Sequence, residues 1–335
     1  MRESDHDLLR WARIDARRLS LDVSREHLLR WYRQMLLARL VDDRLADLRA
    51  GGYASGGASC RGHEAAQIGC IAALSIGTDF ILPYYRDLAA MLALGMPPRA
   101  IFLNQLSRGS DPISNGRMRP AQWNSRALNV ISASGLVGTQ TLHAAGIAFA
   151  ARIRGEAAVA LTFFGEGATS QGDFHEALNF AGLHHLPVIF VCENNGIALS
   201  TPQGTQMPVQ HVADRAAAYG MPGVIVDGTD LLAVIATARD AFANARAGKG
   251  PTLIEVVVPR LATDAPDPRD PVLALRGYLL SRQDLTDAQD ERLRADLGIM
   301  IDAALQEAVN APSPDPATVA EHLFSDSGAS SRKEA

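Results

Sequence analysis

Two nearly continuous apolar runs, Ala157–Phe164 and Val188–Cys192, constrain the fold of this chain more than any other feature. Short runs of this kind, which do not alternate with polar residues, are typical of strands buried on both faces of a parallel sheet. Further strand-like and helical runs lie around them: strands at 80–82, 224–226 and 253–258, and helices at 62–74, 172–184 and 231–247. Because strands alternate with helices, the sequence predicts an α/β protein with a mostly parallel sheet and helices on both faces.

The apolar pattern predicts one large domain, since no linker divides it into two cores. The helical pattern starts after Ser24, and the last predicted helix ends at Val309. We therefore expect an N-terminal extension at 1–23, a domain at 24–310 and a flexible C-terminal tail at 311–335, whose end is rich in Ser, Gly and charged residues. The polar stretch 107–128 is longer than most internal loops, which favours a functional or interface loop.

Composition excludes several classes of protein. The net charge of −5 provides no basic footprint for nucleic acid. Three cysteines without a CxxC spacing argue against a zinc site and for a reducing compartment, and Cys192 is expected to be a buried thiol. The chain opens without a signal-peptide pattern, and its apolar runs fall short of the roughly 18 residues that span a bilayer. A cytoplasmic protein is expected.

Polar residues follow both apolar runs directly. Gly165–Gly167, with Glu166 at its centre, follows the first run, and Glu193–Gly196, which contains Asn195, follows the second. Because the carboxyl ends of parallel strands meet at the same edge of a sheet, Glu166 and Asn195 are expected to lie side by side. A carboxylate, an amide oxygen and a turn carbonyl suit Mg²⁺ or Ca²⁺ shared with a phosphate, rather than zinc.

The glycines of Gly165–Gly167 allow other interpretations. They could form a tight strand-to-helix turn without a ligand, or part of a dinucleotide-binding fingerprint. Ser170 stands where that fingerprint needs its third glycine, and the sequence has no P-loop pattern. Binding of a dinucleotide through this fingerprint, or of a nucleotide through a P-loop, is therefore a weak interpretation.

The stretch 164–201 resembles the motif of thiamine diphosphate enzymes, which opens with Gly-Asp-Gly and closes roughly thirty residues later with Asn-Asn. Its interior is similar to the alpha subunits of 2-oxo acid dehydrogenases of the branched-chain and pyruvate type. Glu166 stands where the motif has Asp, a variant that resembles the branched-chain members. Matching positions include Gln171, Glu176 and Asn179. The similarity covers approximately residues 25–310 and implies the thiamine diphosphate-binding fold.

This resemblance implies thiamine diphosphate and Mg²⁺ as cofactors. It assigns magnesium binding to Glu166, Asn195 and the carbonyl of Ile197. The cofactor-binding residues that it implies are Tyr85, Arg86, Gly135, Val137, Glu166, Gly167, Ala168 and Asn195. The planar guanidinium of Arg86 matches phosphate oxygens. Without the resemblance, Tyr85 and Arg86 could form a surface turn in which Arg86 pairs with Asp87. His63, in a helix that also resembles the family, receives no role.

The sequence departs from the family where catalysis would occur. Relatives carry Tyr-Arg-x-x-x-His-Ser after the last strand, whereas residues 259–266 keep Arg260 but have no His-Ser pair at Thr263 and Asp264. Gln122 also stands where many relatives have His, and the bulky Trp123 beside it is a candidate for the substrate pocket. Since a missing general acid or base costs about 10²–10⁴-fold in rate, the catalytic residues stay unassigned.

The resemblance implies the alpha subunit of an enzyme that oxidatively decarboxylates a 2-oxo acid of the branched-chain type and passes the acyl group to a lipoyl group on a transacylase. It also implies an α₂β₂ heterotetramer whose beta subunit supplies the other half of the site. Two alternatives remain: an acetoin-type or acyloin-forming thiamine enzyme, and a catalytically degenerate assembly subunit. The presence of Glu166, Asn195 and Arg86 argues against the degenerate subunit. The sequence does not name the 2-oxo acid.

Overall fold

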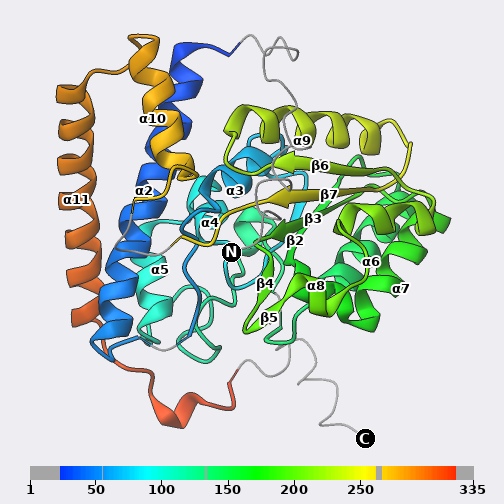
Figure 1. The fold of residues 1–335 in the computed structure, drawn as a ribbon. Helices are drawn as coiled ribbons and strands as arrows, with labels where there is room; N and C mark the ends of the chain where they lie inside the picture. The colour runs from blue at the N-terminus through cyan, green and yellow to red at the C-terminus, as the bar shows by residue number, and fades with distance from the viewer. Residues whose placement is uncertain (1–22, 55, 133, 262–265, 322–335) are drawn as a thin grey trace, which may run out of the picture.

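The main sheet has five parallel strands. The computed structural model describes residues 23–321 except 55, 133 and 262–265 (Figure 1). The strand order is β1-β2-β3-β7-β6, with bounds Phe80–Leu82, Ala160–Gly165, Val188–Asn194, Thr252–Val257 and Gly223–Asp227. An antiparallel pair follows β3 in the chain: β4, Ile197–Ala198, and β5, Thr201–Pro202. The predicted α/β class with a parallel sheet is confirmed.

Helices connect the strands and cover the sheet. Their bounds are α2 Arg25–Ala50, α3 Glu64–Ile71, α4 Leu88–Ala93, α5 Pro98–Gln105, α6 Thr139–Arg154, α7 Gly172–Leu183, α8 Gln203–Gln206, α9 Leu231–Arg246, α10 Pro271–Ser281 and α11 Asp287–Asn310. Short 3₁₀ helices are η1 Arg126–Leu128, η2 Glu166–Ser170, η3 Val212–Tyr219 and η4 Pro316–Thr318. Within the described ranges, no helix has both the length and the apolar character that a membrane span requires.

Side chains on the two faces of the sheet belong to two separate hydrophobic cores. Phe163 and Val191 face the larger core, which also contains side chains of α2, α3 and α9. Phe164 and Phe190 face the smaller core, which they share with α6, α7 and η3. In Figure 1, α9 lies along one side of the sheet, and α6 and α7 lie beyond the other. The expected covering of both faces by helices is confirmed, as is the complete burial of Cys192.

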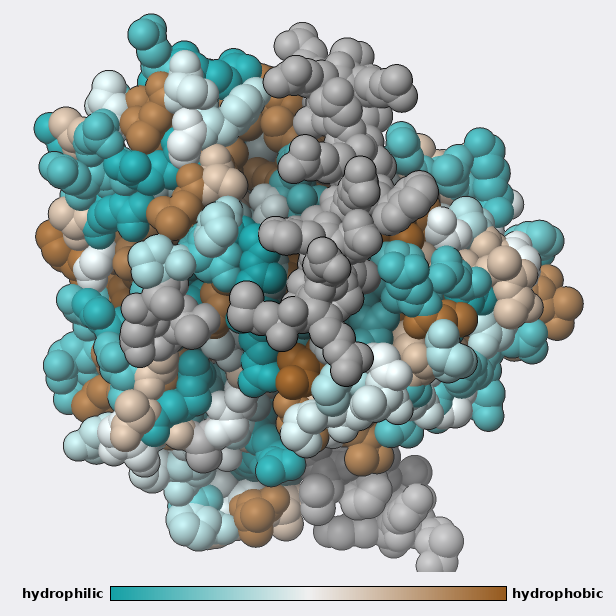
Figure 2. All heavy atoms as spheres, viewed as in Figure 1, coloured by the Kyte–Doolittle hydropathy of each residue, from teal (hydrophilic) through white to brown (hydrophobic). Residues whose placement is uncertain are grey.

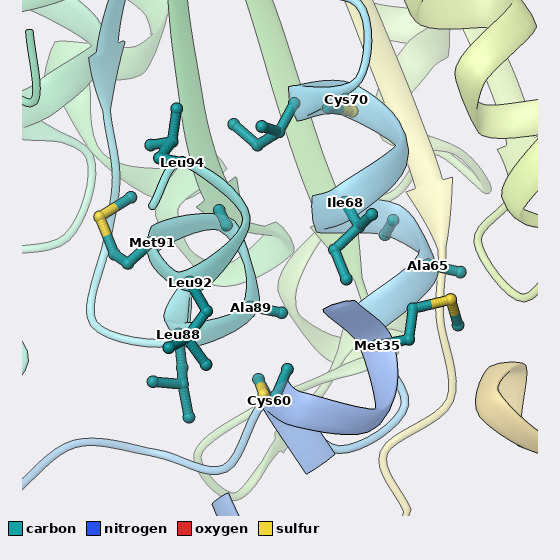
Figure 3. Packing of buried hydrophobic residues seen from close by; sticks show 14 of the residues in the cluster. Met35, Cys60, Ala65, Ile68, Cys70, Leu88, Ala89, Met91, Leu92 and Leu94 are labelled. Atoms are coloured by element: carbon teal, nitrogen blue, oxygen red, sulfur yellow. The ribbon is translucent and has the colours of Figure 1, made fainter. Parts of the chain in front are cut away.

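Helix α3 lies inside the larger core, and all eight of its residues are buried. Figure 3 shows its side chains gathered between α2, α3 and α4, including Met35, Ile68 and Met91. A Cβ atom on Gly69 would lie 2.6 Å from Cγ1 of Val234, so glycine lets α3 approach α9 closely. This close packing fixes the second half of α3 against α9.

A layer of long helices lies outside the larger core. Figure 1 shows α2, α10 and α11 side by side, and Figure 2 shows that the surface over α10 and α11 mixes hydrophilic with hydrophobic residues. Asp290 of α11 joins the three helices, because it accepts hydrogen bonds from Tyr32 at 2.6 Å and from Arg276 at 2.6 Å. The predicted start of the helical pattern after Ser24 is confirmed, since Ser24 caps α2, and Thr286 caps α11 in the same way.

Residues 311–321 lie against the predicted 107–128 loop, in which η1 is the one regular element among the described residues. The amide of Gly109 donates to the carbonyl of Pro312 at 2.9 Å, and Arg117 donates to the carbonyl of Thr318 at 2.9 Å. Of the predicted N-terminal extension, 1–23, and flexible tail, 311–335, residues 1–22 and 322–335 lie outside the described residues, whereas 311–321 are held by these hydrogen bonds.

Candidate active site

The carboxyl ends of β1, β2 and β3 lie next to one another and deliver the predicted polar residues to one edge of the sheet. Gly165, the last residue of β2, is in register with Glu193 near the end of β3. Glu166 and Asn195 follow these positions, and the amide of Asn195 faces Oε2 of Glu166 at 3.4 Å. The two residues therefore meet as the strand order predicts.

Glu166 carries a buried carboxylate with one unpaired oxygen. Its side chain is 2% exposed, and Oε1 has no hydrogen-bond partner in the described part of the chain. Burial raises the pKa of the Glu166 carboxyl above its ordinary value. A buried carboxylate oxygen without a partner costs free energy, and a cation would remove this cost.

The turn after β3 presents two further oxygen atoms. Oδ1 of Asn195 accepts a hydrogen bond from the amide of Ile197 at 3.2 Å, while Oδ1 of Asn194 accepts one from the amide of Gly196 at 2.9 Å. Gly196 has a φ of +80°, a conformation that glycine adopts without strain. Asn194 is buried inside the turn, whereas Asn195 and Ile197 are partly exposed on it.

The turn that carries Glu166 is fixed by β4 and by Gln206. A Cβ atom on Gly167 would lie 2.5 Å from Cβ of Ala198, so this glycine is required by the packing of β4. The packing of Gly167 against β4 was not predicted from the sequence, and the expected role of its backbone in cofactor binding stays a prediction. Nε2 of Gln206 donates to the carbonyl of Glu166 at 3.0 Å, and Ala168 is buried.

Arg86 reaches toward the site from the turn after β1. Its Nη1 donates to the carbonyl of Ser59 at 2.6 Å. Asp87 instead accepts from the amide of Tyr84 at 2.8 Å, so the alternative in which Arg86 pairs with Asp87 is wrong. Tyr85 is partly exposed, and the guanidinium carbon of Arg86 lies 5.7 Å from the centre of its ring.

A buried polar network beneath this turn was not predicted. Oε2 of Glu193 accepts from Tyr84 at 3.1 Å and Gln67 at 3.2 Å, and it lies 2.6 Å from Nδ1 of His63. Burial lowers the pKa of His63, and burial followed by the nearby Glu193 carboxylate raises that of Asp87 well above its ordinary value. The polar residues His63 and Gln67, four residues apart in a mostly apolar segment, were the available signal.

The loop that contains Gly135 and Val137 lies beside the Glu166 turn. A Cβ atom on Gly138, at the end of this loop, would lie 3.5 Å from the carbonyl oxygen of Ala168. Gly135 and Val137 themselves are exposed. Trp123, the predicted wall of a substrate pocket, is instead 1% exposed inside the larger core, which argues against that role.

A parallel sheet with a carboxylate, an amide and an arginine at one carboxyl edge is the arrangement of α/β proteins that bind anionic ligands there. Comparison with known families narrows this class. The model of the family described as dehydrogenase E1 component matches residues 32–265, and the chain belongs to this family.

Three relatives illustrate the similarity. The chain is 37% identical over 324 residues to the 2-oxoisovalerate dehydrogenase subunit alpha of Bacillus subtilis, a match that covers 92% of this chain and 98% of that protein. It is 42% identical over 246 residues to the 3-methyl-2-oxobutanoate dehydrogenase subunit alpha of Mycobacterium tuberculosis, which covers 72% and 64%. It is 35% identical over 326 residues to the pyruvate dehydrogenase E1 component subunit alpha of Staphylococcus aureus, which covers 91% and 84%.

Proposed function

We propose that this chain is the alpha subunit of a 2-oxo acid dehydrogenase that oxidatively decarboxylates a branched-chain 2-oxo acid and transfers the acyl group to a lipoyl group. The observation that carries the proposal is the similarity, over 98% of its length, to a relative whose name specifies 2-oxoisovalerate. The domain that performs this function would span residues 24–310.

The described residues fit thiamine diphosphate with Mg²⁺. The unpaired Oε1 of Glu166 is a hard oxygen in need of a cation, and Asn195 and the carbonyl of Ile197 would complete the ligands from this chain. Tyr85 and Arg86 would bind the diphosphate together with the backbone of Gly167 and Ala168, which lie in the first turn of η2. The backbone of Gly135 and Val137 would contact the aminopyrimidine ring.

When bound, thiamine diphosphate supplies a nucleophilic carbon and an electron sink for the loss of CO₂ from a 2-oxo acid. This chain contributes binding and orientation. The carbonyl of Ser59 holds one N–H of Arg86 and so directs the guanidinium, and the Glu193 network supports the same turn from below. The groups that move protons remain unassigned, because part of the loop after β7 lies outside the described residues.

The partners follow from the same proposal. A beta subunit would complete an α₂β₂ heterotetramer, and a transacylase would present the lipoyl group. Leu136, 74% exposed beside Gly135, is an apolar side chain that a partner would cover at the site. The buried free thiols Cys60, Cys70 and Cys192 support a reducing compartment, for which we propose the cytoplasm.

The test is dye-linked oxidation of pyruvate, branched-chain and aromatic 2-oxo acids by the chain copurified with its beta subunit, thiamine diphosphate and Mg²⁺. We expect the highest kcat/KM with branched-chain acids. Glu166→Ala should weaken magnesium binding by more than about 100-fold, since even the outer partners of a metal ligand contribute 10–100-fold. Glu307→Ala, which alters an exposed glutamate paired with Arg99, should retain wild-type turnover.

Other outcomes would redirect the assignment. Tight cofactor binding with no turnover of any 2-oxo acid would exclude the dehydrogenase and favour an acyloin-forming enzyme. Failure of the assembled wild-type protein to bind thiamine diphosphate at all would leave the role of an assembly subunit.

A further inference from the structure

We propose that Glu255 is a positioning residue for the turn Asn194–Ile197, and through this turn for the magnesium ligands Asn195 and Ile197. The inference rests on the proposed function, because that function gives the turn a metal to bind. Glu255 itself touches neither Asn195 nor Ile197 in any hydrogen bond of the described chain, so its influence passes through Asn194.

The location of Glu255 requires an explanation. It lies within β7, in register with Cys192 of the adjacent β3, and its side chain is fully buried. An ionised carboxylate in the interior of a sheet costs several kcal/mol unless its oxygens are satisfied. The basic group that faces it is His211, whose Nδ1 lies 3.7 Å from Oε2 and makes no hydrogen bond to any described residue.

Both oxygens of Glu255 accept hydrogen bonds from segments that flank the site. Oε1 accepts from Nδ2 of Asn194 at 2.6 Å, and Oε2 accepts from the amide of Ala213 at 2.9 Å. An ionised carboxylate can accept at both ends, whereas an amide of the same shape has one acceptor and one donor. The site therefore selects glutamate over glutamine at this position.

The bond to Glu255 decides which way the amide of Asn194 faces. With Nδ2 held by Glu255 and by Oε1 of Gln203 at 2.8 Å, Oδ1 is directed at the amide of Gly196. A flipped amide would place its NH₂ group against that N–H and open the turn. Because Asn195 lies between these two bonded residues, the orientation of Asn194 fixes where Asn195 meets Glu166.

The first experiment uses the full chain copurified with its beta subunit. Isothermal titration measures the affinity for Mg²⁺ at saturating thiamine diphosphate. Glu255→Gln should weaken magnesium binding by about 10–100-fold, the usual effect of removing a group that orients a metal ligand. The control Asp290→Asn removes another buried carboxylate, which bonds Tyr32 of α2 and Arg276 of α10 and takes no part in the magnesium site. It should leave the magnesium affinity unchanged.

A paired exchange separates positioning from a general loss of structure. Asn194→Asp alone places two carboxylates in contact and should also weaken magnesium binding. The double variant Glu255→Gln with Asn194→Asp restores a donor opposite an acceptor and keeps an acceptor for both Gly196 and Ala213, although it loses the bond from residue 194 to Gln203. It should bind Mg²⁺ more tightly than either single variant.

The outcomes are distinct. Wild-type affinity in Glu255→Gln, or a double variant no better than the single variants, would overturn the positioning role. If Glu255→Gln does not fold, recovery of folding and magnesium binding in the double variant supports the role, and lack of recovery overturns it. Absence of magnesium binding by the wild-type complex would instead refute the proposed function, which Glu166→Ala tests independently.

Discussion

Arg39 illustrates how a single buried residue stabilises the packing of several helices. Its Nε donates to Glu64 at 2.6 Å, and its two terminal nitrogens donate to Asp270 at 2.7 and 3.0 Å. Asp270 also caps α10 by accepting from the amide of Val272. Burial alone would raise the pKa of Asp270, but hydrogen bonds from Arg39 outweigh it and keep that pKa below its ordinary value. One arginine thus joins α2, α3 and α10.

Asp270→Asn should destabilise the protein by about 3–5 kcal/mol, because it leaves the buried charge of Arg39 short of a partner. A carboxyl whose folded pKa is lowered stabilises the protein above its unfolded pKa of about 4, and this contribution is lost as the pH falls through the folded pKa. The difference in the free energy of unfolding between Asp270→Asn and the wild type should stay constant from about pH 5 to 8 and shrink below about pH 4.

Urea unfolding at a series of pH values measures this difference. The control is Asp302→Asn, which alters an aspartate paired with Arg44 on the surface and should not change stability measurably. A destabilisation by Asp270→Asn that grows below pH 4 would contradict the assigned role of the ion pair.

At this scale, the sequence predicted the residues that follow a strand directly and missed those brought together by packing. The closeness of Glu166 to Asn195 could be predicted because it depends only on the pairing of two adjacent parallel strands. The contact of His63 with Glu193 joins residues 130 positions apart and depends on how α3 docks against β3. The role of Gly167 depends likewise on β4, which sequence periodicity does not reveal.

Among the elements, α7 and η3 are in unusually close contact. A Cβ atom on Gly182 of α7 would overlap the carbonyl oxygen of Tyr219 at the end of η3. By contrast, a Cβ atom on Gly298 of α11 would meet nothing within 4 Å. Both glycines lie within helices, Gly182 in the last turn of α7 and Gly298 in the middle of α11, so their substitutions can be compared.

Gly182→Ala should destabilise the protein by about 1–3 kcal/mol, because the backbone of η3 has to shift. Gly298→Ala should stabilise it by about 0.5–1 kcal/mol, the gain expected when alanine replaces glycine in a helix without a clash. Thermal unfolding of the two variants measures whether Gly182→Ala lowers the stability and Gly298→Ala raises it. A neutral or stabilising effect of Gly182→Ala would mean that α7 and η3 separate without cost.

Most of the elements that the sequence predicted show a clear pattern of apolar residues. The apolar runs of β2 and β3 and the periodic helices α7, α9 and α11 were all predicted. The short helices α4 and α5, the two-residue strands β4 and β5, and α10 were not. Asp270 and Pro271 are a cap and a first-turn proline that could have revealed α10, but their segment is equally typical of a loop.

At the scale of the whole molecule, an apolar surface lies next to the proposed cofactor site. Leu136 is 74% exposed, and Val137 is 36% exposed. If a beta subunit completes the site, it should cover these residues, since exposed apolar groups beside a binding site commonly mark an interface.

Hydrogen exchange with and without the beta subunit tests this expectation. The amides of Leu136 and Val137 should exchange more slowly in the complex, while those of β2, at the centre of the sheet, should be protected in both states. Unchanged exchange at 136–137 on formation of the complex would place the interface elsewhere. The layer order of the molecule was predictable from the strand and helix pattern, whereas the outer packing of α2, α10 and α11 was not.

The pairing of β1 with β2 has a consequence for how the chain is made. Leu82 and Thr162, which are bonded across these strands, are 80 positions apart in the sequence. At the usual synthesis rates, about 4–16 s pass between the emergence of the two strands from the ribosome. During that interval the apolar residues of β1 have no partner strand, and such non-local contacts also slow folding. We therefore expect folding of the newly made chain to depend on chaperones, because the cofactor site is assembled from strands that are distant in the sequence.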